Sequence, residues 1–329
     1  MKTKRVLIDG RWAGDTGIGR LYKEVMANAP AAVDFEFVKS NMGLGNLFSP
    51  LMLANEIKRS SAEVFYSPSF MPPLYSRTPF IFTIHDLMHL FYYSSLHRIY
   101  YRQVIARLAS NAKQIITVSH FSKQQLISLL GIREEIISVI YNGVDASFLN
   151  NSEEMSLDRP YFLYVGNRRK NKNLPAMITA FATADIPGEF ILALSGHPDS
   201  DLELLLKKLK IKKRVRFLGF IEDEDLPKYY RGAFATLFVS LMEGFGLPLI
   251  ESMASRTPVL TSSENALAEV AGGAALCVDP LSVEAIKSGI ERLVNDRTLY
   301  QECVLKGYER AGHFSWETTA KKTWELILS

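Results

Sequence analysis

The most informative segment of the chain is residues 240–254, Ser240-Leu241-Met242-Glu243-Gly244-Phe245-Gly246-Leu247-Pro248-Leu249-Ile250-Glu251-Ser252-Met253-Ala254, directly after the apolar run 235–239. The run predicts a buried strand, and the proline predicts that a helix begins near position 248. The backbone N–H groups of a Gly-rich turn between them suit a phosphate or sugar oxygen. Glu243 and Glu251 can each accept hydrogen bonds from a polyol. The alternative is a tight turn with a capping glutamate.

Similar strand-then-helix patterns extend along the chain in both directions. Runs rich in Val, Ile and Phe predict strands at 5–9, 33–39, 64–66, 80–84 and 114–119, and again at 161–165, 190–195, 215–218, 235–239 and 259–261. Helical spacing occurs between them, for example at 19–28, 51–60, 96–112 and 122–130. This alternation predicts α/β architecture with doubly wound parallel sheets.

A polar stretch at 150–160 separates the two sets of strands. We therefore expect two Rossmann-like domains, 1–152 and 153–313, with ligands bound beyond the carboxyl ends of the strands, in a cleft between the domains. An amphipathic helix at 316–328 follows, and the segment of about 314–329 is a candidate to pack back on the first domain.

Composition excludes several classes of protein. With 47% hydrophobic and 22% charged residues in 329, the chain is neither disordered nor fibrous. Two cysteines, Cys277 and Cys303, are too few for a disulfide framework and too isolated for a zinc site. The N-terminus lacks the apolar stretch of a signal peptide, and no run approaches the roughly 18 apolar residues of a membrane span. The expectation is a cytoplasmic protein.

The net charge of +3 is unevenly distributed. Residues 1–150 hold 16 Lys and Arg against 11 Asp and Glu, and the remainder holds 22 against 24. Residues 87–133 contain no acidic residue but several cations and tyrosines. Such a segment suits anionic lipid headgroups, whereas the alternative is a solvated helix face with tyrosines in the core. Nucleic acid is disfavoured because no binding motif accompanies the segment.

Together these motifs resemble the family-4 retaining glycosyltransferases of the GT-B fold. Residues 243–248 with Glu251 resemble the family signature. Further stretches match in the family's order: 16–20 (TGIGR), 83–86 (TIHD), 117–123 (TVSHFSK), 141–145 (YNGVD), 164–166 (YVG), 172–174 (KNL), 217–220 (FLGF) and 268–272 (AEVAG). The resemblance implies two domains facing across a cleft and a nucleotide-sugar donor.

The resemblance also implies roles for individual residues. Glu251 should hold the nucleotide ribose, and Glu243 with the backbone of Gly244, Phe245, Gly246 and Leu247 should hold the donor sugar and distal phosphate. The diphosphate should lie against cations and glycines on both domains: Arg168, Lys172, Gly166, Gly17 and Gly19. The base pocket should be lined by Phe220, Ile221 and Leu226. Catalytic roles fall to His85, Glu243, Arg168 and Lys172.

His85 stands out because it follows a strand at the end where ligands gather in this kind of fold. The resemblance places it near the donor sugar and the reacting centre. Asp86 is a candidate to orient its ring. A structural role is the alternative for any isolated histidine.

The chemistry expected is front-face substitution at the anomeric carbon, with Arg168 and Lys172 stabilising the departing diphosphate. A glycosidase is rejected because it requires no anion site. No metal or other cofactor is expected, since Asp199-Ser200-Asp201 and Asp223-Glu224-Asp225 precede helical patterns and are interpreted as helix caps.

Three other functions fit the sequence less well. A dinucleotide-binding loop needs a third glycine where Tyr22 stands. A GT-B nucleotide-sugar epimerase and a catalytically inactive sugar-binding subunit remain as alternatives. Overall similarity favours transfer of mannose from GDP-mannose in bacterial surface polysaccharide synthesis, such as O-antigen of lipopolysaccharide. The acceptor would be a glycan or a polyprenyl-diphosphate-linked sugar at the inner face of the cytoplasmic membrane, to which the protein would be peripheral.

Overall fold

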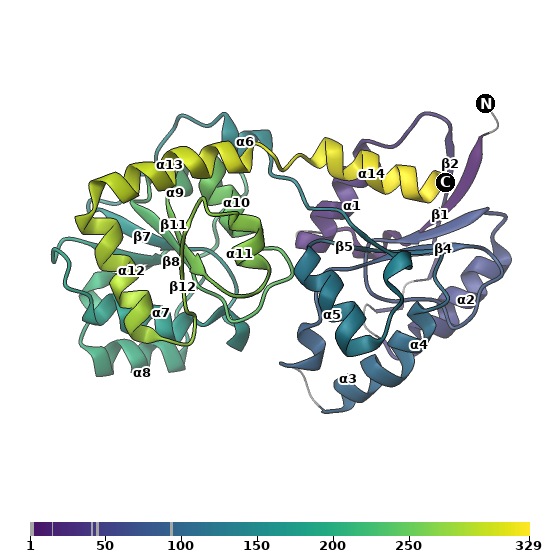
Figure 1. The fold of residues 1–329 in the computed structure, drawn as a ribbon, viewed down its shortest axis with the longest axis horizontal. Helices are drawn as coiled ribbons and strands as arrows, with labels where there is room; N and C mark the ends of the chain where they lie inside the picture. Colours follow the sequence, from purple (N-terminus) through teal and green to yellow (C-terminus); the bar gives the residue numbers. More distant parts are fainter. Residues whose placement is uncertain (1–2, 15, 41, 44–45, 93–94) are drawn as a thin grey trace. The chain divides into compact units, whose positions relative to one another are not determined.

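The computed structural model describes residues 3–14, 16–40, 42–43, 46–92 and 95–329 (Figure 1). The chain forms two compact units. The first unit runs to Gly143 and also contains Ser315–Ser329, and the second unit is Val144–Phe314. Each unit is an α/β structure built on its own parallel sheet.

In the first unit a six-stranded sheet has the order β2-β1-β3-β4-β5-β6. Its strands are β1 (Lys4–Ile8), β2 (Val33–Phe37), β3 (Val64–Ser67), β4 (Phe80–Ile84), β5 (Gln114–Thr117) and β6 (Ile137–Val139). Every residue of the central strands β3 and β4 is buried, which explains their continuous apolar character. The edge strand β6 was not predicted.

Helices cover both faces of this sheet. Helices α2 (Ser49–Arg59), α3 (Ser95–Tyr100), α4 (Ala106–Ala109) and α5 (His120–Leu130) lie on one side, and α1 (Gly17–Ala27) and α14 (Trp316–Leu328) lie on the other (Figure 1). A π-helical turn, Tyr101–Ile105, joins α3 to α4, so the single helix expected over 96–112 is divided. Short 3-10 helices occupy Gly10–Trp12, Met88–Leu90 and Glu134–Ile136.

The second sheet also has six parallel strands, in the order β12-β11-β10-β7-β8-β9. They are β7 (Tyr161–Tyr164), β8 (Ile191–Leu194), β9 (Val215–Phe217), β10 (Ala235–Phe238), β11 (Val259–Ser262) and the unpredicted edge strand β12 (Leu276–Val278). The helices are α6 (Ala146–Leu149), α7 (Leu174–Thr183), α8 (Ser200–Leu209), α9 (Leu226–Gly232), α10 (Leu247–Ala254), α11 (Asn265–Ala271), α12 (Val283–Asn295) and α13 (Arg297–Ala311), with 3-10 turns at Lys170–Lys172 and Lys212–Arg214.

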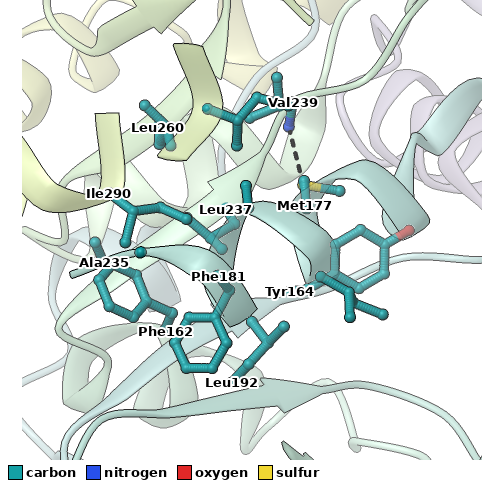
Figure 2. Close-up of a cluster of buried hydrophobic side chains, with 14 of the residues drawn as sticks. Phe162, Tyr164, Met177, Phe181, Leu192, Ala235, Leu237, Val239, Leu260 and Ile290 are labelled. Carbon is teal, nitrogen blue, oxygen red and sulfur yellow. Dashed lines mark hydrogen bonds between the residues drawn. The ribbon is translucent and has the colours of Figure 1, made fainter. Parts of the chain in front are cut away.

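An aromatic and aliphatic core fixes the second sheet against α7 and α12. Figure 2 shows Phe162, Leu192 and Leu237 of the strands packed with Phe181 of α7 and Ile290 of α12, all of them buried. The Val239 N–H, just beyond β10, donates to Met177 Sδ at 3.4 Å. This contact joins α7 to the end of β10, directly before the Gly-rich turn.

The C-terminal helix α14 belongs to the first unit. Its Trp324 Nε1 donates to Val25 O of α1 at 2.7 Å, and its Thr319 Oγ1 donates to Tyr141 O at 2.7 Å. The chain passes from the first unit to the second after Gly143, earlier than the expected residue 152. The reason is that Phe148 of α6 packs on Tyr230, which also belongs to the second unit, with ring centroids 5.8 Å apart. No helix in the described ranges is long and apolar enough to cross a membrane.

Candidate active site

The predicted donor residues of the second unit gather where its strands end. The turn after β10 leads through Gly246 into α10, which begins at Leu247 as the proline predicted. Gly246 has φ +99°, and a Cβ there would lie 2.3 Å from Leu267 Cδ2. Only glycine therefore fits this position. Glu243, Gly244 and Phe245 are buried, and Leu247 is half-buried.

Lys172 and Glu243 form an ion pair at this turn. The Lys172 ammonium donates to Glu243 Oε1 at 2.7 Å, and the two side chains are only 13% and 8% exposed. Lys172 Nζ also lies 5.2 Å from the Phe238 ring centroid. An ammonium has three donors, so the pair leaves two for another acceptor. Lys172 is expected to bind the diphosphate of a donor and Glu243 its sugar. In the structure these two side chains also bind each other.

Two asparagines fix the loop that carries Lys172. Asn171 Nδ2 donates to Met242 O at 3.1 Å, and the Leu241 N–H donates back to Asn171 O at 2.7 Å. Asn173 has φ +58°, and its Nδ2 donates to Val239 O at 3.1 Å and to Pro280 O at 2.7 Å. These bonds join the loop after β7 to the loop after β10. Sequence reasoning assigned neither asparagine a site role.

Arg168 lies near the end of β8. Its Nη1 donates to Asp199 Oδ2 at 3.0 Å, and its Nη2 donates to Ser195 O at 3.4 Å. The Gly166 N–H donates to Ser195 Oγ at 3.1 Å, and Gly166 has φ +151°. Gly166 and Arg168, both expected near a diphosphate, therefore both donate a hydrogen bond to Ser195, at the carboxyl end of β8.

The two aspartate-rich stretches, 199–201 and 223–225, differ in whether an aspartate side chain caps the following helix. Asp199 caps α8 as predicted, because its Oδ1 accepts the Leu202 N–H at 2.9 Å. That bond, and the bond from Arg168, hold the pKa of the Asp199 carboxyl below its usual range. The cap expected from the second stretch is wrong: Asp225 makes no side-chain cap on α9 and instead accepts from Lys228 Nζ at 3.0 Å. The described residues include no group of three or more acidic, His or Cys residues suited to a metal.

Glu251, the expected ribose ligand, is held by a tyrosine. Tyr230 Oη of α9 donates to Glu251 Oε2 of α10 at 3.1 Å. Tyr230 is fully buried, and burial followed by the nearby Glu251 carboxylate raises the Tyr230 pKa well above its usual range. Glu251 is itself 8% exposed. Sequence reasoning missed Tyr230, because no local motif links two residues on separate helices.

The residues expected to line a base pocket follow β9. Phe220 is 75% exposed, whereas Ile221 and Leu226 are half-buried. Gly219 before them has φ +70°, and its carbonyl accepts the Gly196 N–H at 2.6 Å. The ends of β8 and β9 are thereby tied together, and the exposed Phe220 ring is available for stacking.

In the first unit, the predicted glycine loop is held by contacts among its own residues. Thr16 caps α1 by accepting the Gly19 N–H at 3.1 Å, and Gly17 is the first helical residue. A Cβ on Gly19 would lie 1.9 Å from Gly14 O. The absence of a side chain at Gly19 is therefore required by the chain's own backbone, whatever ligand it approaches.

His85 lies just after β4 and is partly buried. Its Nε2 bonds to Pro68 O at 2.8 Å. A carbonyl only accepts, so Nε2 carries the proton and the neutral ring has its lone pair on Nδ1. Burial lowers the His85 pKa. Asp86 Oδ1 accepts the Met88 N–H at 2.8 Å, and the charge of this carboxylate opposes the effect of burial on the His85 pKa. That Asp86 orients the ring stays a prediction.

Sequence reasoning also missed a buried ion pair after β1. Arg11 Nε and Nη2 donate to the two oxygens of Asp9, at 2.7 and 2.8 Å, and Asp9 is fully buried. Ser67 Oγ at the end of β3 adds a bond to Asp9 at 3.3 Å. Charged groups therefore occur at the carboxyl ends of both sheets.

Comparison with known proteins identifies the family. The model described as "Glycosyltransferase Family 4" matches residues 15–148, and that of "Glycosyl transferases group 1" matches residues 146–310. O-antigen chain mannosyltransferase B of Escherichia coli is 28% identical over 279 residues, which are 79% of this chain and 72% of that protein. O-antigen chain mannosyltransferase RfbU of Salmonella typhimurium is 31% identical over 215 residues, which are 64% of this chain and 60% of that protein.

Solved structures share the fold. WaaG, a glycosyltransferase involved in lipopolysaccharide biosynthesis, superposes with a TM-score of 0.77 at 16% identity and 98% coverage of this chain and 99% of that chain. Anabaena HepE, solved in complex with UDP and glucose, gives 0.75 at 18% identity and 98% coverage of both chains. With family models over both halves and two six-stranded parallel sheets, the chain belongs to glycosyltransferase family 4 and is a glycosyltransferase of the GT-B fold.

Proposed function

We propose that the protein is a retaining hexosyltransferase that moves mannose from GDP-mannose onto a lipid-linked or oligosaccharide acceptor in bacterial surface polysaccharide synthesis. The observation that carries the proposal is the buried Lys172–Glu243 pair at the end of β10, with Arg168 at the end of β8, two strands away in the same sheet. The Escherichia coli and Salmonella relatives are O-antigen chain mannosyltransferases, which supports mannose and O-antigen.

In the proposed reaction, the acceptor oxygen forms a bond to the anomeric carbon as the bond to the diphosphate oxygen breaks. The attack occurs on the face that the diphosphate leaves, so configuration is retained. The acceptor hydroxyl proton passes to the departing diphosphate oxygen. Lys172 and Arg168 stabilise the charge that develops there, and no protein nucleophile, metal or cofactor takes part.

Glu243 and Glu251 have binding roles in this scheme. Glu243 orients Lys172 and accepts from a donor-sugar hydroxyl, whereas Glu251, itself held by Tyr230, accepts from the ribose. His85 in the first unit presents a neutral Nδ1 to a hydroxyl of the reacting sugar. Carboxylates and a neutral imidazole all accept hydrogen bonds, which is the capacity that sugar hydroxyls require.

A panel of nucleotide sugars tests the proposal. Transfer to a soluble glycan acceptor is measured at fixed salt, and the anomeric configuration of the product is read by NMR. GDP-mannose should be the best donor, with retention and with full activity in chelator. Sugar isomerisation without an acceptor would instead indicate an epimerase, and nucleotide-sugar binding without turnover would indicate an inactive subunit.

A lipid-linked acceptor would bring the protein to a membrane. We extend the proposal to peripheral attachment at the inner face of the cytoplasmic membrane, through the first unit. The support is charge: residues 87–133 carry no acidic residue, and Arg98, Arg102 and Arg107 are exposed. Anionic headgroups attract such a segment by about 1 kcal/mol per cation near the surface.

A further inference from the structure

The strand β9 lies at an edge of the second sheet, and within the described residues only β8 pairs with it. Just beyond β9, the Leu218 N–H donates to Leu194 O of β8 at 2.9 Å. Because the backbone groups of successive strand residues point to alternate sides, those of Val215 and Phe217 point away from β8. Such unpaired N–H and C=O groups can pair with a strand of another chain.

The chain directly before β9 carries an excess of positive charge. Five exposed lysines form what we call the basic segment: Lys207, Lys208, Lys210, Lys212 and Lys213. In the part of the chain that the structure describes, none of them forms an ion pair. Four of them line a groove of about 620 Å³ beside α8, together with Glu203. The groove therefore favours negatively charged side chains.

The chain directly after β9 carries the opposite charge. Glu222, Asp223 and Glu224 are exposed, and we call them the acidic segment. None of the three forms an ion pair among the described residues, whereas the next residue, Asp225, pairs with Lys228 at 3.0 Å. The free edge of β9 is thus flanked by lysines without carboxylate partners at its amino end and by carboxylates without cationic partners at its carboxyl end.

We propose that two copies of the chain form a dimer by antiparallel pairing of their β9 strands about a two-fold axis. In this arrangement the basic segment of each copy lies against the acidic segment of the other. Centred on Arg216, the pairing places Val215 opposite Phe217 of the second copy, where their outward N–H and C=O groups bond to each other. Parallel pairing would instead bring lysines to lysines, which is destabilising.

Arg216 lies on the axis, where it faces the same residue of the second copy. Each Arg216 Nη2 donates to Asp158 of its own chain at 3.2 Å, so each guanidinium has a carboxylate partner that offsets the repulsion. Lysines beside a short edge strand ordinarily prevent pairing. Here the acidic segment removes that barrier in the antiparallel register alone. Since β9 has three residues, the charges must supply most of the attraction, and the dimer should weaken at high salt.

Charge reversal of each segment tests the dimer by sedimentation velocity. Wild type should dimerise at low salt and dissociate at high salt. Lys212→Glu/Lys213→Glu and Glu222→Lys/Glu224→Lys should each self-associate at least about tenfold more weakly than wild type, because opposite charges become like charges. An equimolar mixture of the two variants should dimerise like wild type, since one copy is then acidic, and the other basic, at both ends of β9.

A cysteine on the axis tests the register. Directly opposite residues of a non-hydrogen-bonded antiparallel pair lie about 4.5 Å apart at Cα, a separation that a disulfide spans. Arg216→Cys should therefore give a disulfide-linked dimer with oxidised glutathione, whereas Lys321→Cys, exposed on α14 of the first unit, should not. Lys321→Glu/Lys322→Glu controls for the change in net charge and should dimerise like wild type. The circular dichroism of every variant should match that of wild type.

Three results would overturn the dimer through β9. Wild type that stays monomeric at low salt would show that the edges do not pair. Reversal variants that stay monomeric when mixed, or that each dimerise as well as wild type, would remove the part given to charge. Absence of the disulfide in Arg216→Cys would rule out the antiparallel register. Neither donor binding nor transfer requires a second copy, so these measurements go beyond the proposed function and test the dimer independently of it.

Discussion

The two units place chemically important side chains at the same end of their sheets, but they hold them differently. In the second unit, both carboxylates have side-chain partners: the Lys172 ammonium pairs with Glu243, and the Tyr230 hydroxyl donates to Glu251. In the first unit, the predicted site residues bond to backbone, as His85 does to Pro68 O. The difference teaches that a substitution at Lys172 uncovers a buried charge, whereas one at His85 leaves an ordinary polar group. The first unit does contain one buried ion pair, Asp9–Arg11, but neither residue was a predicted site residue.

The largest expected effect is that of Lys172→Ala. It removes the cation proposed for the diphosphate, so kcat should fall by about 10²–10³. It also leaves Glu243 buried without its partner, which should lower the free energy of unfolding by about 3 kcal/mol. Steady-state kinetics and denaturant titration measure the two effects.

A double variant separates the two roles of Lys172. Lys172→Met/Glu243→Gln removes both charges, so stability should recover while turnover stays low. Lys170→Ala, in the same turn, is the control and should behave like wild type in both assays. Near-wild-type activity of Lys172→Ala would rule out its catalytic role.

A smaller effect is expected from Tyr230→Phe. The Glu251 carboxylate loses a buried donor, and a hydrogen bond to a charged group contributes about 1.5–3 kcal/mol. Because Tyr230 acts through Glu251, the KM for the donor should rise about tenfold with kcat nearly unchanged. The Kd for the nucleoside diphosphate should rise in parallel, as measured by calorimetry.

The neighbouring Tyr229→Phe variant controls for loss of a hydroxyl on the same helix. It should leave KM unchanged. If Tyr230→Phe lowered kcat and KM equally, or destabilised the protein without changing nucleotide affinity, then the tyrosine would be structural and the contrast between the two units would weaken.

The smallest effect concerns His85 and pH. Burial lowers the His85 pKa in the folded protein, so the unfolded chain takes up the proton first as pH falls below about 6.5. This group should therefore reduce stability on acidification, and it should contribute no pH dependence well above 6.5. Thermal melts at pH 7.5 and 5.5 measure the loss, which should be smaller in His85→Gln. An identical acid response in wild type and His85→Gln would contradict the neutral, buried state of His85.

Much of the fold could be predicted from local pattern. Each strand that was predicted exists within a few residues of its expected place, because buried parallel strands are continuously apolar. The two edge strands, β6 and β12, were missed because three residues are too short a signal. The π-helical turn at Tyr101–Ile105 was missed because helical periodicity does not distinguish one extra residue in a turn.

The candidate site was predictable only in part. Cations, carboxylates and glycines near strand ends could be named from their order along the chain. Their partners could not be named, because they come from distant segments. Tyr230 contacts Glu251, Asn171 contacts the turn after β10, and Pro68 contacts His85. No periodicity encodes contacts across so many residues.

By itself, the sequence determined the class of fold, the order of the longer strands, and the membership of the family, because these depend on local apolar pattern and on motifs. Only the tertiary structure decided that Lys172 and Glu243 neutralise each other and that α14 returns to the first unit. The physical reason is that pairing and exposure depend on which segments meet in space, and burial then determines how strongly each charge interacts with its partner.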